Sequence, residues 1–330
     1  MDKLLALAIP TYNRSRFLRR LLLSIKEQYI EDSDIGNHLD IYVFDNDSPD
    51  DTEKLVKSSG LPIIYKKNHE NIGGDRNILQ AYSMPKAKYI WVMGDDELIV
   101  PGAIKNILKN LSNENPSLLL LKDNDIARRK AYEKQLIHSY PNYAKFIDDM
   151  IEKRSPLMDH SLIARNVLLS SLFDKDKALS KIKTSYYSHM YGLLNKLTGN
   201  GMKIILTEYP AIQVVEDHFI PEPSCDPVGS KYLSVQSVYE MHSVMRRSYD
   251  EYRCWTLSKF SSKPAHPRIF LLRLNLKMEI ERWFLMFKSS PNLFVKNLLW
   301  FVYYKLYDFK ILRTCIFEPL KRMTGIKRKR

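Results

Sequence analysis

A buried strand that ends in three consecutive acids constrains the fold of this chain more than any other feature. Residues 89–97 read YIWVMGDDE, so an apolar, aromatic-rich run breaks at Gly94 and is followed by Asp95, Asp96 and Glu97. This pattern predicts a buried strand that ends in a turn. Carboxylates packed together repel one another, and burial removes their solvation, unless a cation lies among them. We therefore expect a hard divalent ion that shares its oxygen ligands with substrate phosphates. A solvated acidic turn is the alternative.

The segments around this motif alternate between expected strands and expected helices. Apolar runs predict strands at residues 4–9, 40–44, 62–65 and 117–121, besides the strand that carries the acids. An amphipathic stretch at residues 16–28 predicts a helix. Further helices are expected from Pro49 (capped by Ser48), from the motif at residues 71–77 towards Tyr82, and from Pro101. This alternation indicates an α/β fold with a mostly parallel sheet and helices on both faces.

Polar residues gather where the expected strands end. The four clusters are residues 11–14, 45–47, 71–77 and 95–97. In open parallel sheets, ligands bind beyond the carboxyl ends of the strands. The sequence therefore predicts a binding site along this edge of the sheet.

Four motifs in this order resemble those of a known family. They are PTYNR (10–14), DNDSPDDT (45–52), NIGGDRN (71–77) and GDDE (94–97), and they resemble the successive motifs of family 2 glycosyltransferases, whose fold is called GT-A. Within that family the pattern looks most like bacterial enzymes that build lipopolysaccharide, O-antigen or capsule. The resemblance implies a GT-A domain over residues 1–230, with a nucleotide-sugar half at about 1–125 and an acceptor half at about 126–230.

The resemblance also implies a role for individual residues of the motifs. Thr11, Tyr12 and Arg14 are expected against the base and ribose of the nucleotide. Asp45 is expected to accept a hydrogen bond from the base, Asp95 to approach the ribose, and Arg76 to lie near the diphosphate or sugar. Pro10, Asn46 and Gly73 complete the expected nucleotide-sugar site. Asp96 is the expected ligand of Mg²⁺ or Mn²⁺, with Glu97 as a possible helper.

Plainer interpretations of these residues stay open. The family's acidic motif is usually D-x-D, and Gly94 stands at its first position here, which leaves Asp96 with few protein carboxylates to share the ion. Tyr12 can close a turn, Asp45 can form an Asx turn, and Gly73 can simply begin a helix.

Relatives of this kind invert the anomeric centre, and many use an acid at the start of a later helix as the base. The comparable segment here, residues 184–197, reads TSYYSHMYGLLNKL and contains His189 instead. Histidine suits proton transfer because its ordinary pKa lies near working pH, although a packed helix histidine is equally compatible with the pattern. Asp217 and His218 follow a strand-like run at residues 211–215 and are the alternative candidates for the base, unless they belong to a surface loop.

The last hundred residues carry the whole net excess of positive charge of the chain. Residues 1–230 hold 30 Lys and Arg against 31 Asp and Glu, whereas residues 231–330 hold 21 against 7. Large apolar and aromatic side chains interleave with these basic residues, which predicts amphipathic helices on an anionic membrane surface. A helical region packed on the first domain is the alternative. No apolar run approaches the ~20 residues that span a bilayer, and no nucleic-acid-binding motif argues for that partner.

These features together predict an enzyme at the cytoplasmic face of the inner membrane. Three widely spaced cysteines suit a reducing cytosol, and residues 4–9 are too short for the apolar core of a signal peptide. We expect a metal-dependent inverting glycosyltransferase that moves a sugar from a nucleoside diphosphate donor, a UDP-sugar, to a glycan or lipid-linked glycan. A sugar nucleotidyltransferase is an alternative, although PTYNR lacks the glycines of its phosphate loop. The other alternative is a non-catalytic scaffold that has the same fold and lies on the membrane surface.

Overall fold

The computed structural model describes residues 2–124, 138–153, 164–182, 187–197 and 201–214. The chain divides into two compact units, Met1–Tyr249 and Asp250–Arg330, and all described residues belong to the first. The predicted boundary at residue 230, the basic region 231–330, and both Asp217 and His218 lie outside the described residues.

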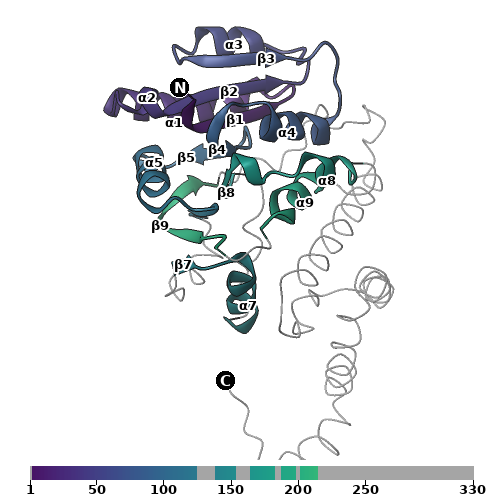
Figure 1. Ribbon diagram of the computed structural model, residues 1–330. Helices are drawn as coiled ribbons and strands as arrows, with labels where there is room; N and C mark the ends of the chain where they lie inside the picture. The colour runs from purple at the N-terminus through teal and green to yellow at the C-terminus, as the bar shows by residue number, and fades with distance from the viewer. Residues whose placement is uncertain (1, 125–137, 154–163, 183–186, 198–200, 215–330) are drawn as a thin grey trace, which may run out of the picture. The chain divides into compact units, whose positions relative to one another are not determined.

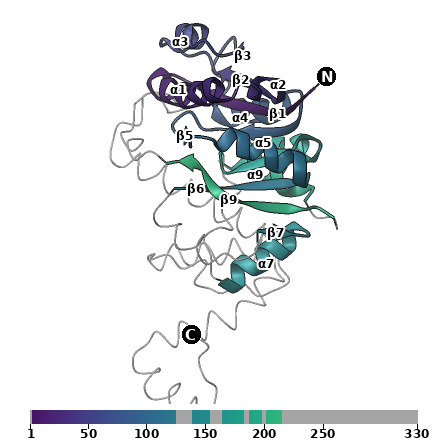
Figure 2. The same cartoon turned by 90° about the vertical axis from the view of Figure 1, so that its left-hand side faces the viewer.

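A nine-stranded sheet forms the centre of the first unit, in the order β3-β2-β1-β4-β8-β6-β9-β5, with β7 paired to β9 (Figures 1 and 2). Its strands are β1 (Lys3–Thr11), β2 (Leu39–Asp45), β3 (Ile63–Lys67), β4 (Ala87–Val92), β5 (Leu98–Ile99), β6 (Leu118–Asp123), β7 (Ser139–Tyr140), β8 (Asn166–Leu169) and β9 (Ile204–Gln213). Strands β1 to β4 are mutually parallel, and β6 is parallel to β9, whereas β8, β5 and β7 run antiparallel to their partners. The prediction of a mostly parallel sheet is confirmed.

Helices cover both faces of this sheet (Figure 1). One face carries α1 (Ser15–Glu31), α2 (Ile35–His38) and α5 (Ala103–Glu114), and the other carries α4 (Gly74–Ser83), α8 (Lys175–Leu179) and α9 (Ser188–Asn195). The remaining helices are α3 (Thr52–Ser58) beside the edge strand β3, the single 3-10 turn η2 (Ser170–Leu172) and α7 (Tyr143–Lys153).

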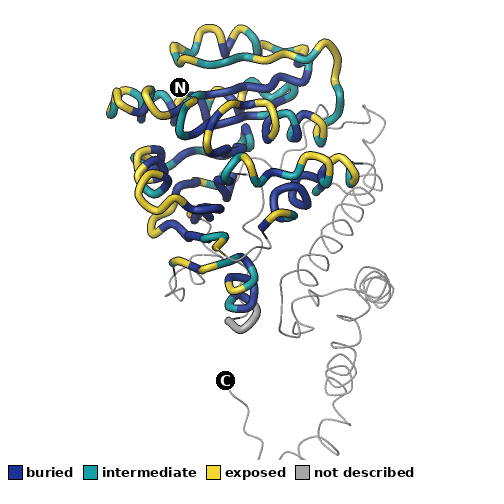
Figure 3. Tube along the Cα trace, viewed as in Figure 1, coloured by how far each residue is buried: buried dark blue, intermediate teal, exposed yellow. Residues whose placement is uncertain are grey.

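The core lies between the central strands and the apolar faces of the helices (Figure 3). Strand β1 is buried on both faces from Leu5 to Ile9, as expected of a central strand with helices on each side. The apolar stripe of α1, predicted from its spacing, is buried at Phe17, Leu18, Leu21, Leu22 and Ile25.

Two local expectations are wrong in detail, and one short strand was not expected. Helix α3 begins at Thr52 rather than at Pro49, because Ser48 is used elsewhere: its backbone N–H donates to Asp45, and its hydroxyl accepts from the N–H of Asn13. Helix α5 begins at Ala103 rather than Pro101, after Gly102 in a left-handed conformation. The two-residue strand β5, which directly follows the acidic motif, has no signal of its own in the sequence, because it exists only through its pairing with β9.

No helix within the described ranges is both long and apolar enough to cross a membrane.

Candidate functional site

The tips of β1 and β4 hold the first pair of site residues, Thr11 and Asp95. These parallel neighbours end at the same edge of the sheet, and the hydroxyl of Thr11 donates a 2.7 Å hydrogen bond to Asp95 Oδ2. Both side chains are buried. Burial raises the pKa of Asp95 to about 6, and the nearby charge of Asp96 adds to the rise, whereas Arg14 opposes it.

Arg14 supplies a cation to the acidic motif. Its Nε lies 2.8 Å from Asp95 Oδ1, and its Nη2 lies 2.8 Å from Asp96 Oδ2. The guanidinium group also covers the ring of Phe17, at 4.4 Å from the ring centroid. The sequence requires a positive charge among these carboxylates, and the fold provides one from the loop after β1.

Glu97, the third acid, faces a different partner. Arg165 Nη2 lies 2.8 Å from Glu97 Oε1, and Arg165 Nε donates a 2.6 Å hydrogen bond to Asp123 Oδ2 at the end of β6. All three residues are buried, and burial raises the pKa of Glu97 against the opposing effect of Arg165. Glu97 is thus the partner of an arginine in a buried charged triad, and its expected help in metal binding stays a prediction. No motif pointed to Arg165 or Asp123, because only the antiparallel pairing of β8 brings them here.

Asp96 is the most accessible acid of the motif, with a side chain that is 32% exposed. Among the described residues, no group of three or more His, Cys, Asp or Glu side chains is arranged to hold a metal ion. Mg²⁺ is commonly held by only one or two carboxylates together with substrate phosphates. The donor set around Asp96 fits a site of that kind and does not form a preassembled cage.

The tip of β2 buries Asp45 completely. Its Oδ1 accepts a 2.8 Å hydrogen bond from the N–H of Ser48, and its Oδ2 accepts a short one from the hydroxyl of Tyr65 on β3. Burial and this carboxylate raise the pKa of Tyr65. The bond to Ser48 reaches three residues along the chain, one further than an Asx turn, and holds the bend after β2. Each carboxylate oxygen has a second lone pair, so Asp45 can still accept a hydrogen bond from the nucleotide base. That hydrogen bond stays a prediction.

Asparagine side chains tie the loop after β3 to the ends of β1 and β2. Asn46 donates from Nδ2 to Asn71 Oδ1 at 2.7 Å, and its Oδ1 accepts from the N–H of Ile72 at 3.0 Å. Asn77, in the first turns of α4, donates from Nδ2 to the carbonyl oxygen of Phe44 at 2.9 Å and to that of Thr11 at 3.5 Å. With the bonds of Thr11 and Arg14 to the acidic motif, all four predicted clusters are therefore joined directly by hydrogen bonds.

The other expected donor-site residues lie at the same edge, and their roles stay predictions. Tyr12 and Pro10 are half-buried, and Arg76 is exposed on α4. Gly73 has a φ of 87°, a left-handed value that favours glycine, and a Cβ added there would meet no atom within 4 Å. Backbone conformation alone therefore explains this glycine, and its contact with a nucleotide sugar stays a prediction.

His189 lies on α9, where a helix was expected, but its ring is buried at 3% exposure. It stacks on Tyr82 at 6.1 Å between ring centroids, and neither ring nitrogen has a hydrogen-bond partner among the described residues. Burial lowers its pKa to about 4. The reason given for His189, a pKa near working pH, is therefore wrong, whereas its role as the base is untested and stays a prediction.

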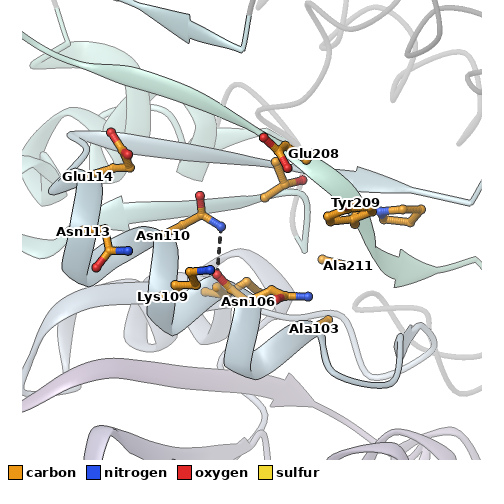
Figure 4. A pocket seen from close by; sticks show the side chains of 12 residues that line it. Ala103, Asn106, Lys109, Asn110, Asn113, Glu114, Glu208, Tyr209 and Ala211 are labelled. Atoms are coloured by element: carbon orange, nitrogen blue, oxygen red, sulfur yellow. Dashed lines mark hydrogen bonds between the residues drawn. The ribbon is translucent and has the colours of Figure 1, made fainter.

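A separate cleft of about 220 Å³ lies between α5 and β9 (Figure 4). Asn106, Asn110 and Asn113 line it from the helix, and Glu208 and Tyr209 from the strand. None of the acids at the strand tips lines this cleft, so its position gives it no part in the site described above.

Comparison with known proteins identifies the domain. The model of the glycosyl transferase family 2 matches residues 6–162, a range that includes all four motifs and the edge of the sheet at which they meet. Residues 6–162 form a family 2 glycosyltransferase domain. The predicted family is thus confirmed.

Two curated proteins resemble this family 2 domain in sequence. Abequosyltransferase RfbV of Salmonella typhimurium is 36% identical over 105 residues, which cover 31% of this chain and 30% of RfbV. The poly(ribitol-phosphate) β-N-acetylglucosaminyltransferase TarP of Staphylococcus aureus is 25% identical over 220 residues, which cover 65% of this chain and 64% of TarP. The matched segments span less than two thirds of either protein.

Among solved structures, the S. aureus TarS fragment 1–349 has a TM-score of 0.57 at 14% identity, covering 88% of this chain and 81% of that one. At this identity the likeness establishes the fold, which is the GT-A fold predicted from the motifs.

Proposed function

We propose that this family 2 glycosyltransferase moves a sugar from a UDP-sugar to a hydroxyl group of a growing cell-surface glycan, with inversion at the anomeric carbon. Lipopolysaccharide, O-antigen or capsule is the expected class of product. The observation that carries the proposal is the cluster of Thr11, Asp95, Arg14 and Asp96, which gathers one accessible carboxylate and one guanidinium at the carboxyl edge of the sheet.

This cluster suits a nucleoside diphosphate. The guanidinium of Arg14, whose Nε and Nη2 now lie 2.8 Å from Asp95 and Asp96, has the donors to bind phosphate oxygens. Buried Asp45 and Asp95 flank the place where the resemblance puts the base and the ribose. TarS, which shares the fold, is known in complex with UDP and with UDP-GlcNAc, and this supports a UDP-sugar as the donor.

Asp96 is the residue that we expect to hold Mg²⁺ or Mn²⁺. Such an ion, when bound, spreads the charge that develops on a diphosphate leaving group. The chain's own residues prepare this place: Thr11 orients Asp95, and Arg14 offsets the repulsion between the two carboxylates.

The acceptor and the cellular position are the finer parts of the proposal. RfbV and TarP are named for the transfer of sugars, and the second name specifies a poly(ribitol-phosphate) acceptor. By analogy we propose a glycan or lipid-linked glycan acceptor for this chain. We further propose that the basic residues of 231–330 hold the enzyme on the anionic inner face of the cytoplasmic membrane.

Product analysis with a panel of nucleotide sugars tests the proposal. The purified chain is incubated with each donor, with Mn²⁺ or EDTA, and with extracted lipid-linked glycans. Release of UDP together with a labelled glycan is the expected result. Release of pyrophosphate would mean a sugar nucleotidyltransferase, and donor binding without release of either product would mean a scaffold that only retains the fold.

A further inference from the structure

Asp75 lies where the starts of two helices meet. It stands in the first turn of α4, and its Oδ1 accepts a 3.3 Å hydrogen bond from the hydroxyl of Ser188, the first residue of α9. Helices α4 and α9 pack together on one face of the sheet (Figure 1). Ser188 is buried, whereas Asp75 is only half-buried.

The first turns of α4 are fixed to the candidate site. Asn77, two residues after Asp75, donates hydrogen bonds to the carbonyl oxygens of Phe44 and Thr11. Thr11 in turn donates to Asp95. Asp75 therefore belongs to a helix start that is held against the strand tips, beside the place proposed for the donor.

Asp75 differs from the acids of the GDDE motif in its partners. Asp95 and Asp96 are paired with Arg14, and Glu97 is paired with Arg165. Asp75 makes no ion pair with another described residue, and its one hydrogen bond comes from a neutral hydroxyl. Because no cation is paired with this carboxylate, no ion pair lowers its pKa.

The surroundings of Asp75 favour proton uptake near working pH. Burial raises its pKa to about 6, and the hydroxyl of Ser188 opposes this rise. The titratable group next to Ser188 on α9 is His189, which is neutral above about pH 4. Next to Asp75 on α4 lies the exposed Arg76. A base is most effective when its pKa lies close to the pH at which it works.

We propose that Asp75 is the catalytic residue that accepts the proton of the acceptor hydroxyl group. The inference rests on the proposed function. The acceptor oxygen forms a bond to the anomeric carbon, and its proton passes to a carboxylate oxygen of Asp75. The bond between that carbon and the diphosphate oxygen breaks, and its electron pair leaves with the nucleoside diphosphate. Ser188, at the start of α9, is a positioning residue whose hydroxyl orients the carboxylate of Asp75.

The competing interpretation is that Asp75 only joins α4 to α9. The variant Asp75→Asn separates the two, because asparagine has the same shape and still accepts the bond from Ser188, but cannot take up the proton. We expect turnover to fall by about 10²-fold or more, with unchanged affinity for UDP in calorimetry and an unchanged unfolding midpoint. Glu70→Gln, an exposed acid in the preceding loop, is the matched control and should keep full turnover.

Ser188→Ala provides a second test, which is the pH dependence of turnover. If the bond between Ser188 and Asp75 were purely structural, its loss would not shift this pH dependence. Wild-type turnover should fall as pH drops through about 6, because the base becomes protonated. Loss of the serine hydroxyl should move this midpoint to higher pH, since that hydroxyl lowers the pKa of Asp75.

The outcomes distinguish the two proposals. If the wild type transfers sugar and Asp75→Asn turns over equally well, Asp75 is not the base and the glycosyltransferase function still stands. If His189→Phe loses turnover while Asp75→Asn does not, the base is His189. If the wild type binds UDP-sugars but transfers nothing to any acceptor, the proposed function fails and this inference fails with it.

Discussion

Arg14 Nη2 donates a 2.8 Å hydrogen bond to Asp96 Oδ2, while its Nε contacts Asp95. The first motif of the chain thus provides the counter-charge for the last, over a separation of 82 residues. The two carboxylates differ in exposure, because Asp95 is buried and Asp96 is not. Asp95 therefore depends on the guanidinium group to stay charged, whereas Asp96 can exchange this partner for another cation or for water.

Arg14→Gln should destabilise the protein by about 1–3 kcal/mol, because the buried Asp95 loses its charged partner. The variant should also bind UDP more weakly. Urea unfolding and calorimetry measure both effects. Arg16→Gln is the matched control, since Arg16 is an exposed arginine in the first turn of α1 and covers the same Phe17 ring. Equal stability of the two variants would show that the bridge to Asp95 contributes nothing.

Asp96→Asn should abolish the metal-dependent part of donor binding and leave the fold intact. The variant loses an ion pair that solvent already screens, and it also removes repulsion with Asp95, so the two effects on stability nearly offset. Calorimetric titration of the donor with and without Mn²⁺ measures the loss of metal-dependent binding. Electron paramagnetic resonance spectra of Mn²⁺ in the presence of UDP measure the loss of bound metal. Asp51→Asn, an exposed acid at the start of α3, serves as the control. Undiminished Mn²⁺-dependent binding in Asp96→Asn would refute the assignment.

Arg165→Met should cost about 3–5 kcal/mol of stability, because it leaves Glu97 and Asp123 as buried carboxylates without their shared guanidinium. Glu97→Gln should cost less, since the pair of Arg165 and Asp123 remains. If Glu97 serves the triad rather than the metal, Glu97→Gln keeps the Mn²⁺ dependence of donor binding. A loss equal to that of Asp96→Asn would instead make Glu97 a metal ligand.

His189→Phe should make stability less sensitive to acid. The folded pKa of His189, about 4, lies below its ordinary value of 6.5, so its contribution is fully present above pH 6.5 and is lost as pH falls towards 4. Over that whole interval the wild type should lose about 3 kcal/mol more than the variant. Phenylalanine preserves the stacking on Tyr82. Unfolding curves at pH 7.5 and 4.5 provide the comparison, and parallel losses in both proteins would contradict the burial of a neutral imidazole.

Deletion of residues 321–330 should weaken binding to anionic vesicles. This segment contains six basic residues, and each is worth about 1 kcal/mol near an anionic surface at low salt. Co-sedimentation with phosphatidylserine vesicles at low and physiological salt measures the effect, with phosphatidylcholine vesicles as the control. Activity on a soluble acceptor should persist in both chains. Equal partitioning of the full-length and shortened chains onto the vesicles would show that residues 321–330 do not contribute to membrane binding.

The sequence by itself determined the order of the elements and the edge at which the site lies. Each strand tip carries its polar motif locally, and parallel pairing brings equivalent ends together, so the positions of Thr11, Asp45 and Asp95 followed from pattern alone. Family motifs then gave the class of enzyme.

Only the tertiary structure decided which acids are paired and which are accessible. Arg14 and Arg165 reach the GDDE motif from places 82 and 68 residues away in the chain, and no local pattern records such a contact. The same holds for Asp75, which meets Ser188 across 113 residues, and for His189, which stacks on Tyr82 and whose burial lowers its pKa to about 4. Spacing along a chain fixes which face of an element a residue occupies, but desolvation and charge depend on what packs against that face. The residue types of the site were therefore readable from the sequence, and their protonation and partners were not.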